Sequence, residues 1–253
     1  MSADASPAIR LPAWQTCLDI EGQDAAHYLD YVNEPMFLGI DGDPGRVLEL
    51  GCAAGKFGMV LKERHPQARV TGIEAGRAAA EIAATRLDKV ICSRIEDVDF
   101  AAHGIGPGAF DLVVAGDVLE HMSNPWAALV RLRPLIAPGG RLVASIPNVR
   151  NLQVLEGLAV RGRFDYADRG LLDITHLRFF ALDDIRLMLD TTGYKLEAFH
   201  FTISPRLHKT YKENEGKEKV TLNVGRMTLA DVTPRDLMEF CAEQYIVRAR
   251  PRP

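Results

Sequence analysis

The stretch that decides the fold is Arg46-Val-Leu-Glu-Leu-Gly-Cys-Ala-Ala-Gly-Lys-Phe-Gly58. Val47 to Leu50 form a β-forming run that is too short for a helix, so they predict a strand. A glycine turn follows, and Lys56 to Glu63 predicts a helix that ends near Pro66. Strand, glycine turn and helix in this order present backbone groups to a nucleotide-like ligand at the carboxyl edge of a doubly wound sheet.

The spacing of the glycines excludes two common nucleotide-binding motifs. A dinucleotide fingerprint counted from Gly51 needs glycines where the chain has Ala53 and Lys56, which excludes a nicotinamide dehydrogenase. A Walker loop needs Ser or Thr after Gly-Lys, where the chain has Phe57. The pattern that remains is acid-x-Gly-x-small-x-Gly.

Strands and helices alternate through the rest of the first half of the chain. Strands are predicted at 69–74, 89–92, 110–115 and 141–147, and helices at 76–87 and 124–136. Such alternation predicts a parallel sheet covered by helices on both faces. Further along, we predict a helix at 149–163, an irregular segment at 164–180, a helix at 182–192 and an antiparallel edge made by strands at 194–203 and 244–250. The Lys- and Glu-rich segment 207–220 is expected to be mostly a solvated loop.

Composition limits the classes of function. The chain of 253 residues is 47% apolar and 25% charged, which is typical of a globular protein with a full core. Its net charge of −4 provides no broad basic field for nucleic acid. The chain has no apolar run of the roughly 20 residues that a membrane helix needs, and its N-terminus lacks a signal-peptide pattern. Four scattered cysteines without a C-x-x-C pair predict reduced thiols in a cytoplasmic protein.

The acid–glycine pattern resembles the first motif of class I S-adenosylmethionine (SAM) methyltransferases. The resemblance implies that Glu49 helps to hold the amino end of the methionine moiety and that the turn with Gly51, Cys52 and Gly55 wraps the cofactor. Ala53 replaces the central glycine of the family and narrows the turn by a methyl group. We interpret Cys52 as a small residue beside the ligand and not as a nucleophile, because no base is close in sequence.

The resemblance implies an α/β fold: a Rossmann-like, doubly wound, mostly parallel seven-stranded sheet with an antiparallel last strand. We expect one methyltransferase domain over residues 1–253. Its expected parts are an N-terminal lid helix at 21–40, a SAM-binding core at 45–147, an acceptor-side insertion at 148–181, and a C-terminal helix with antiparallel strands at 182–253.

Residues at the ends of the predicted strands complete the expected cofactor site. Glu74 ends the strand 69–74, and its two acceptor oxygens suit both hydroxyls of a ribose; a solvated glutamate is the alternative. Members of the family often have an aspartate near position 94 that contacts adenine. Since Arg94 stands there, Ile95 and Glu96 are expected at the adenine instead. The full expected set is Tyr31, Glu49, Gly51, Cys52, Gly55, Glu74, Ala75, Ile95, Glu96, Gly116, Asp117 and Leu119.

The segment Ala115-Gly-Asp-Val-Leu-Glu-His-Met122 resembles the segment after strand four in the broad group containing ubiquinone-biosynthesis methyltransferases. The resemblance places Asp117 near the sulfonium, Leu119 under the cofactor, and Glu120 and His121 toward the acceptor. His121 is a candidate general base, because an unperturbed pKa of about 6.5 lets it accept a hydroxyl proton at neutral pH. A loop-capping histidine is the alternative. Because the acid–histidine pair has no second histidine or carboxylate cluster near it, no metal is expected.

The segment from Gly162 to Phe180 resembles one shared by bacterial methyltransferases found with polysaccharide and glycan biosynthesis enzymes. Asp173, His176 and Arg178 concentrate hydrogen-bonding groups where an acceptor must approach. His176 is therefore the second candidate base, and Asp173 and Arg178 are candidate substrate-binding residues. Alternatively, His176 and Arg178 tie the loop to the next helix.

Two tyrosines near the N-terminus are the last candidates. Tyr28 and Tyr31 lie three residues apart, on one face of a predicted helix. In the methyltransferases that the chain resembles, such a helix lies over the ligand mouth, so Tyr31 would contact the cofactor and Tyr28 the substrate. Docking of an accessory helix onto the core is an equal alternative.

The first hypothesis for function is SAM-dependent O-methylation of a sugar, glycan or related hydroxylated small molecule, because a hydroxyl acceptor benefits from a base. A quinone-like or other small metabolite is the second hypothesis. A SAM-binding partner subunit without catalysis stays open, since intact cofactor motifs fit both roles. The partners expected are the acceptor and no nucleic acid, and the oligomeric state, a homodimer included, stays open.

Overall fold

Seven strands form one sheet in the computed structural model, which describes residues 31–252. The strands lie in the order β3-β2-β1-β4-β5-β9-β6. They are β1 (Arg46–Leu50), β2 (Arg69–Glu74), β3 (Lys89–Cys92), β4 (Phe110–Gly116), β5 (Ile136–Pro147), β6 (Tyr194–Ile203) and β9 (Ala242–Pro251). β9 runs antiparallel to β5 and β6, whereas the pairs among β1 to β5 are parallel. The predicted fold class is confirmed, with one detail changed: β9 lies inside the sheet and β6 forms its edge.

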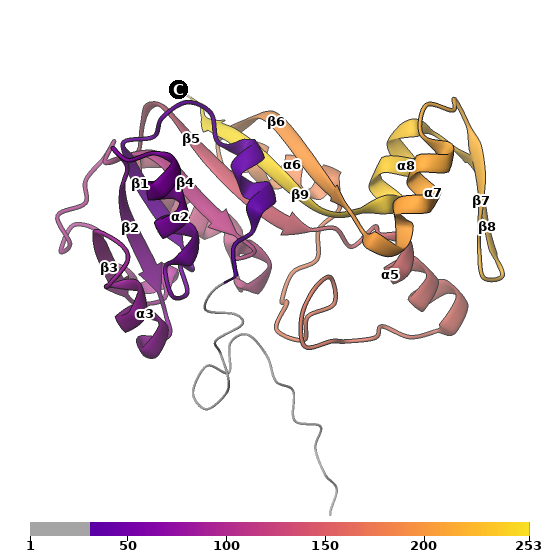
Figure 1. Cartoon of the computed structure of the whole chain (residues 1–253), viewed down its shortest axis with the longest axis horizontal. Helices are drawn as coiled ribbons and strands as arrows, with labels where there is room; N and C mark the ends of the chain where they lie inside the picture. Colours follow the sequence, from indigo (N-terminus) through magenta and orange to yellow (C-terminus); the bar gives the residue numbers. More distant parts are fainter. Residues whose placement is uncertain (1–30, 253) are drawn as a thin grey trace, which may run out of the picture.

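Both faces of the sheet are apolar, because successive residues of each strand point to opposite faces. Val47 and Val114 pack on one face with Met36 and Leu61, which belong to the 3₁₀ helix η1 (Glu34–Gly39) and to α2 (Lys56–Arg64). The other face is covered by α4 (Pro125–Leu132) and α6 (Leu182–Thr191). Figure 1 shows η1 and α2 in front of the sheet and α6 behind it.

The other helices are short and lie at the ends of strands or in the second half of the chain. They are α3 (Arg77–Ala83), η2 (Ile95–Asp97), η3 (Leu119–His121), η4 (Arg133–Leu135), α5 (Leu152–Glu156), the π-helix η5 (Gly157–Arg161), η6 (Pro205–Leu207), α7 (His208–Asn214) and α8 (Pro234–Cys241).

Several predicted boundaries need correction, among them the end of the helix predicted at 76–87, which is Ala83, and the helix predicted at 149–163, which is α5 followed by η5. The helix predicted at 124–136 ends at Leu132 and continues as the 3₁₀ turn η4, because Pro134 lacks the N–H that an α-helix needs. β5 begins at Ile136, which pairs with Phe110 before a register shift, and not at Arg141. Of the expected lid helix at 21–40, the described part contains only η1, which has Pro35 near its start. Tyr28 lies outside the described residues.

Segment 205–241 forms a small lobe that the sequence analysis did not predict. It consists of η6, α7, the hairpin β7 (Val220–Val224) and β8 (Met227–Val232), and α8, and it lies at one end of the sheet beside α5 (Figure 1). Leu222, Phe240 and Leu152 are among the residues of its apolar core. The expectation of a mostly solvated loop at 207–220 is therefore wrong for 208–214, which form α7, whereas 215–219 are an exposed loop. Leu207 and Tyr211, four residues apart, pack against this core, which leaves His208 and Lys209 between them exposed to solvent.

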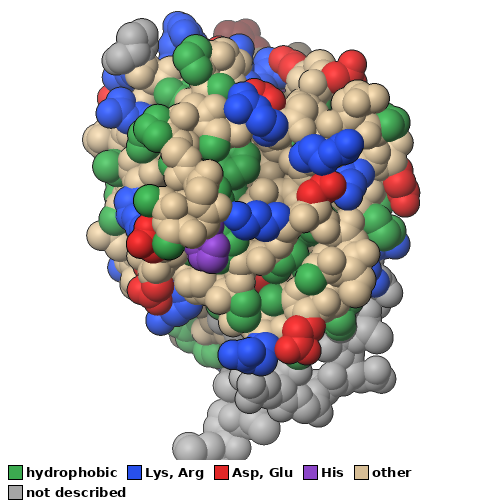
Figure 2. Space-filling model, turned by 90° about the vertical axis from the view of Figure 1, so that its left-hand side faces the viewer, with side chains coloured by type: hydrophobic (Ala, Val, Ile, Leu, Met, Phe, Trp, Pro, Cys, Tyr) green, Lys and Arg blue, Asp and Glu red, His purple; other side chains and the backbone are tan. Residues whose placement is uncertain are grey.

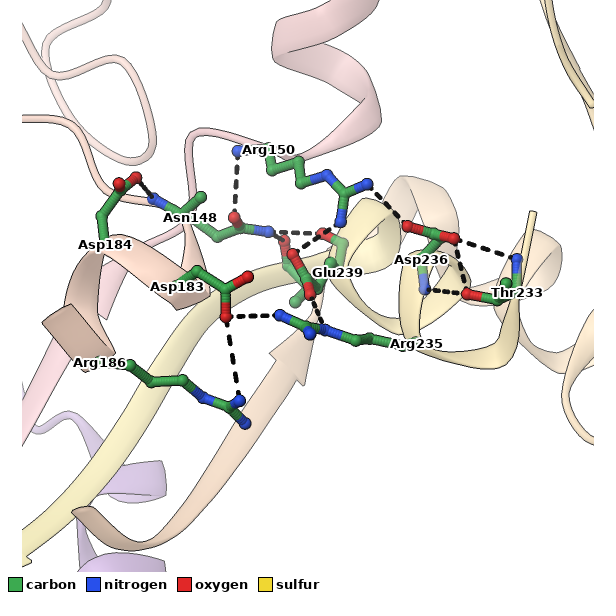
Figure 3. Close-up of polar contacts among 11 residues, drawn as sticks. Asn148, Arg150, Asp183, Asp184, Arg186, Thr233, Arg235, Asp236 and Glu239 are labelled. Carbon is green, nitrogen blue, oxygen red and sulfur yellow. Dashed lines mark hydrogen bonds and ion pairs between the residues drawn. The ribbon is translucent and has the colours of Figure 1, made fainter. Parts of the chain in front are cut away.

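A network of ion pairs joins the lobe to the sheet (Figure 3). Glu239 of α8 is 2% exposed, and its two carboxylate oxygens bind Arg150 Nη1 at 2.8 Å and Arg235 Nε at 2.7 Å. Arg150 also binds Asp236 at 2.7 Å. Asn148, just after β5, donates to the backbone carbonyl of Glu239 at 2.6 Å. A buried carboxylate needs such partners, so the network fixes how α8 meets the end of β5.

Charges of both signs are mixed on the face shown in Figure 2, where Lys and Arg side chains alternate with Asp and Glu. Among residues 31–252, no helix is long and apolar enough to cross a membrane.

Arg150→Ala should lower the free energy of unfolding by about 2 kcal/mol, because it takes one partner from the buried Glu239 carboxylate. Arg186→Ala is the matched control. Arg186 forms an ion pair with the exposed Asp183 at 3.8 Å and lies over the Phe199 ring at 5.6 Å, both weak surface contacts, so its loss should cost less than about 1 kcal/mol. Urea unfolding of both variants measures the difference. Equal stabilities would show that the network does not hold the lobe.

Candidate active site

The glycine turn after β1 has a left-handed backbone at three positions. Gly51, Ala53 and Gly55 have φ angles of 58°, 45° and 75°. Gly51 requires glycine for two reasons. Its φ is positive, and an added Cβ would lie 2.7 Å from the side chain of Val118. Ala53 adopts the same region at a cost of roughly 1 kcal/mol or more. Its backbone N–H donates to Glu74 Oε2 at 2.9 Å, which helps to hold it there.

Glu74 stands at the carboxyl end of β2, where the sequence predicted it. Its Oε2 accepts from Ala53 N–H, and its Oε1 accepts from Gly76 N–H at 2.8 Å. These two bonds fix the carboxylate beside the glycine turn. Each carboxylate oxygen can accept more than one hydrogen bond, so the fork remains able to accept two ribose hydroxyls.

A cavity of about 100 Å³ lies against the glycine turn and the end of β4. It is lined by Tyr31, Asn33, Met36, Glu49, Leu50, Gly51, Cys52, Ala53, Lys56, Phe57, Val114, Gly116 and Asp117. Six of the twelve expected cofactor residues are in this set. Of the others, Leu119 is fully buried in the core, whereas Ala75, Ile95 and Glu96 follow β2 and β3 outside the cavity.

The carboxyl group of Glu49 is buried at the floor of this cavity, with 5% of the residue exposed. Burial raises its pKa to about 8, although a hydrogen bond from the backbone of Gly58 acts in the opposite direction; the nearby Glu74 carboxylate raises the pKa further. Its Oε2 has no hydrogen-bond partner within residues 31–252. An ammonium group is the kind of ligand that would favour the ionised carboxylate.

Asp117 is held by two residues that the sequence analysis missed. Asn33 Nδ2 donates to Asp117 Oδ2 at 2.8 Å, and Ser145 Oγ donates to Oδ1 at 2.8 Å. Burial raises the pKa of Asp117, whereas both hydrogen bonds act to lower it. A signal was present for Ser145, since it is the single hydroxyl in the apolar run of β5. Asn33 gave none.

Backbone hydrogen bonds join η3, after β4, to the segment 163–180. The N–H groups of Leu177 and Arg178 both donate to the carbonyl of Glu120, at 2.8 and 3.0 Å. The Arg178 guanidinium donates to the backbone carbonyls of Leu177 and Ser123. We call these contacts the latch. They bring together two segments that the sequence analysis expected on the acceptor side.

The latch places Glu120, His121 and His176 side by side. The rings of His121 and His176 lie edge to face with centroids 4.7 Å apart, and His176 Nε2 is 4.0 Å from Glu120 Oε1. Glu120 is 1% exposed and His176 is 8% exposed, whereas His121 is half-buried. Glu120, which was expected to open toward the acceptor together with His121, has a buried side chain that faces His176.

Burial dominates the protonation of these groups. It raises the pKa of Glu120 well above the ordinary value, and the neighbouring Asp117 charge adds to the effect. It lowers the pKa of His121 and, with His121 adding to the effect, lowers that of His176 to about 4. Both imidazoles are therefore neutral at pH 7.

Asp173 and Thr175 fix the tautomer of His121. Thr175 Oγ1 donates its hydrogen to Asp173 Oδ1 at 2.6 Å and lies 3.0 Å from His121 Nδ1. Since the hydroxyl hydrogen goes to Asp173, Nδ1 carries the hydrogen of the ring and donates it to Thr175. His121 Nε2 keeps its lone pair. Asp173 is 4% exposed, and its carboxylate binds Thr175. The sequence had instead predicted that Asp173 contacts the acceptor.

Comparison with known proteins identifies the family. The family model described as a methyltransferase domain matches residues 22–198, so the chain belongs to this family. More narrowly, its fold and cofactor motifs are those of a class I SAM-dependent methyltransferase. The ubiquinone biosynthesis O-methyltransferase of Schizosaccharomyces pombe is 34% identical over 105 residues, 40% of this chain and 37% of that protein.

Other relatives show the same partial coverage. Malonyl-[acyl-carrier protein] O-methyltransferase of Geobacter sulfurreducens is 25% identical over 60% of this chain and 57% of that protein. Trans-aconitate 2-methyltransferase of Rhodopseudomonas palustris is 32% identical over 47% and 44%. The chain thus spans about half the length, or less, of these curated relatives.

Solved structures share the fold. The plantazolicin methyltransferase BpumL, in complex with SAH (S-adenosylhomocysteine), has a TM-score of 0.55 at 15% identity, covering 90% of this chain and 84% of that one. A possible histamine N-methyltransferase of Thermotoga maritima has a TM-score of 0.55 at 16% identity, covering 86% of each chain.

Glu74→Ala should weaken SAH binding by about 1–3 kcal/mol, because charge-assisted hydrogen bonds to the ribose are lost. Glu81→Ala, on the exposed side of α3, is the matched control and should bind as the wild type does. Calorimetry with SAH measures both. An unchanged dissociation constant in folded Glu74→Ala would remove Glu74 from the site.

SAH affinity should rise with pH up to about 8 and then level off. The Glu49 carboxyl has a pKa raised to about 8, so below that pH it must lose its proton before it can attract the ammonium group. The affinity should change by up to about tenfold per pH unit below 8. Glu49→Gln should flatten this profile. A profile that is equally steep in the variant would assign the titration to another group.

Proposed function

We propose that this protein transfers the methyl group of SAM to a hydroxyl of a sugar, a glycan unit or a related hydroxylated small molecule. One observation carries the proposal: the latch brings His121 and His176 to the end of β4, beside the Asp117 wall of the cofactor cavity. Methyl transfer is an in-line displacement at the sulfonium carbon, so the protein supplies alignment, exclusion of water and activation of the acceptor.

His121 is the member of this cluster that an acceptor can reach. His176 and Glu120 are nearly fully buried, whereas His121 is half-buried and keeps a lone pair on Nε2. A cofactor seated on the glycine turn would direct its methyl group away from that turn, toward η3 and the segment 163–180. We therefore assign activation of the hydroxyl to His121, and we assign to His176 a supporting position behind it.

The segment 163–180 favours a sugar as the acceptor. Tyr166 is 46% exposed and lies edge to face with Phe164, at 5.1 Å between centroids. Arg163 and Asp165 form an ion pair beside them at 3.0 Å. An exposed aromatic face next to hydrogen-bonding groups suits the apolar face and the hydroxyls of a sugar ring. Asp173 and Arg178 would act on the acceptor through the shape that they give this segment.

A quinone-like phenol is the second acceptor class, and one relative favours it. The ubiquinone biosynthesis O-methyltransferase is similar over 40% of this chain, and a planar ring would also pack on Tyr166. Release of SAH in parallel panels of oligosaccharides and phenols separates the two classes.

His121→Ala should lower kcat roughly 10²–10⁴-fold while SAH affinity stays within about twofold of the wild type. His103→Ala, an exposed histidine after β3, is the control and should keep the wild-type rate. A lower melting temperature with a retained rate would instead make His121 structural. If His176→Ala also keeps the wild-type rate, neither histidine removes the proton. The protein would then act only by aligning the acceptor with the methyl group.

A further inference from the structure

We propose that Glu120, His121 and His176 bind a divalent first-row transition-metal cation on the acceptor side of the active site. The inference rests on the proposed function and deepens it: His121 would act on the acceptor hydroxyl through a cation bound to its Nε2, and would not take the proton itself. No metal is expected from the sequence alone, because no second histidine stands near His121 along the chain. The latch supplies that histidine from 55 residues further along the chain.

The three side chains converge at the spacing that a cation site needs. One ligand atom from each residue lies within 4.8 Å of the other two, and Glu120 Oε1 is 4.0 Å from His176 Nε2. Metal–ligand bonds of about 2.0–2.2 Å place neighbouring ligand atoms about 3 Å apart, so a small rotation of the side chains closes the site. One carboxylate and two imidazoles are the donors that Zn²⁺, Fe²⁺, Co²⁺ and Mn²⁺ share.

The Glu120 carboxylate is the strongest sign of a missing partner. Both of its oxygens are buried and accept no hydrogen bond from residues 31–252. A buried carboxylate without a donor is costly, and native structures rarely leave one. A cation between Glu120 and the two imidazoles would satisfy these oxygens.

The hydrogen bonds around His121 match those of a metal ligand. A ligating histidine usually donates its second ring N–H to an oxygen that is itself anchored by a carboxylate or the backbone. His121 Nδ1 meets Thr175 Oγ1 at 3.0 Å, and Thr175 is anchored by Asp173 at 2.6 Å. This arrangement leaves His121 Nε2 for the cation.

Three protein ligands leave open positions, where the acceptor hydroxyl can bind. Coordination would lower the pKa of the hydroxyl, so that its proton passes to solvent. The oxygen then forms the bond to the methyl carbon while the carbon–sulfur bond breaks, and the electron pair of that bond stays on sulfur in SAH. The cation is neither oxidised nor reduced.

Cobalt(II) titration of untagged, metal-stripped full-length protein tests the site without any acceptor. The wild type should develop visible ligand-field absorption and bind one Co²⁺ per chain with a micromolar dissociation constant. Glu120→Gln should weaken binding at least 30-fold without lowering the melting temperature, because it removes a buried carboxylate. Thr175→Val should weaken binding about tenfold. His103→Gln is the matched control and should bind as the wild type does.

The inference is overturned if the wild type binds no Co²⁺ or Zn²⁺ at 1 mM, or if Glu120→Gln and His176→Gln bind as tightly as the wild type. Methylation of an oligosaccharide that continues undiminished in chelator would also overturn it and leave the proposed function standing. If Co²⁺ binds as described but no hydroxyl acceptor is methylated with or without cation, the proposed function fails and the metal site stands.

Discussion

The active site depends on the left-handed backbone of Asp117 at the end of β4. Its φ of 52° is unfavourable for most residues, although aspartate tolerates it better than most. Ser145 Oγ accepts the Asp117 N–H at 2.9 Å and donates to its carboxylate, and Asn33 binds the second carboxylate oxygen. Because the chain turns sharply here, Glu120 enters the interior and His121 meets His176. The strain lies beside the cavity at the glycine turn, where we propose that the cofactor and the acceptor meet.

Much of the fold could be predicted because its signals are local. Strands β2, β3 and β6 have the predicted bounds: β2 and β3 are short runs rich in β-branched residues, and β6 is a longer strand bounded by Gly193 and by Ser204-Pro205. The lobe could not be recognised from the density of Lys and Glu alone. Its signals were nevertheless present: alternating apolar residues over 220–224 and 227–232, and a Thr233–Asp236 capping box before α8.

Only those site residues that stand at the ends of strands could be predicted from the sequence. Glu49, Glu74 and Asp117 stand at strand ends, and parallel strands bring their carboxyl ends to one edge. The pairing of His121 with His176 depends on backbone hydrogen bonds between Glu120 and a segment without regular structure, which no periodicity reveals. The burial of Glu120 follows from the sharp turn at Asp117. The same turn brings Glu120, His121 and His176 together, which the sequence did not predict and which makes a metal site possible.

The most direct test of this account is a crystal structure of the protein with SAH bound. The account predicts that the ribose hydroxyls bind the Glu74 carboxylate and that the sulfur lies between Asp117 and His121, on the side of the latch. In that position, a methyl group on the sulfur would point at an acceptor held against the segment 163–180. SAH bound with its sulfur directed away from His121, or bound at a site without Glu74, would contradict the account.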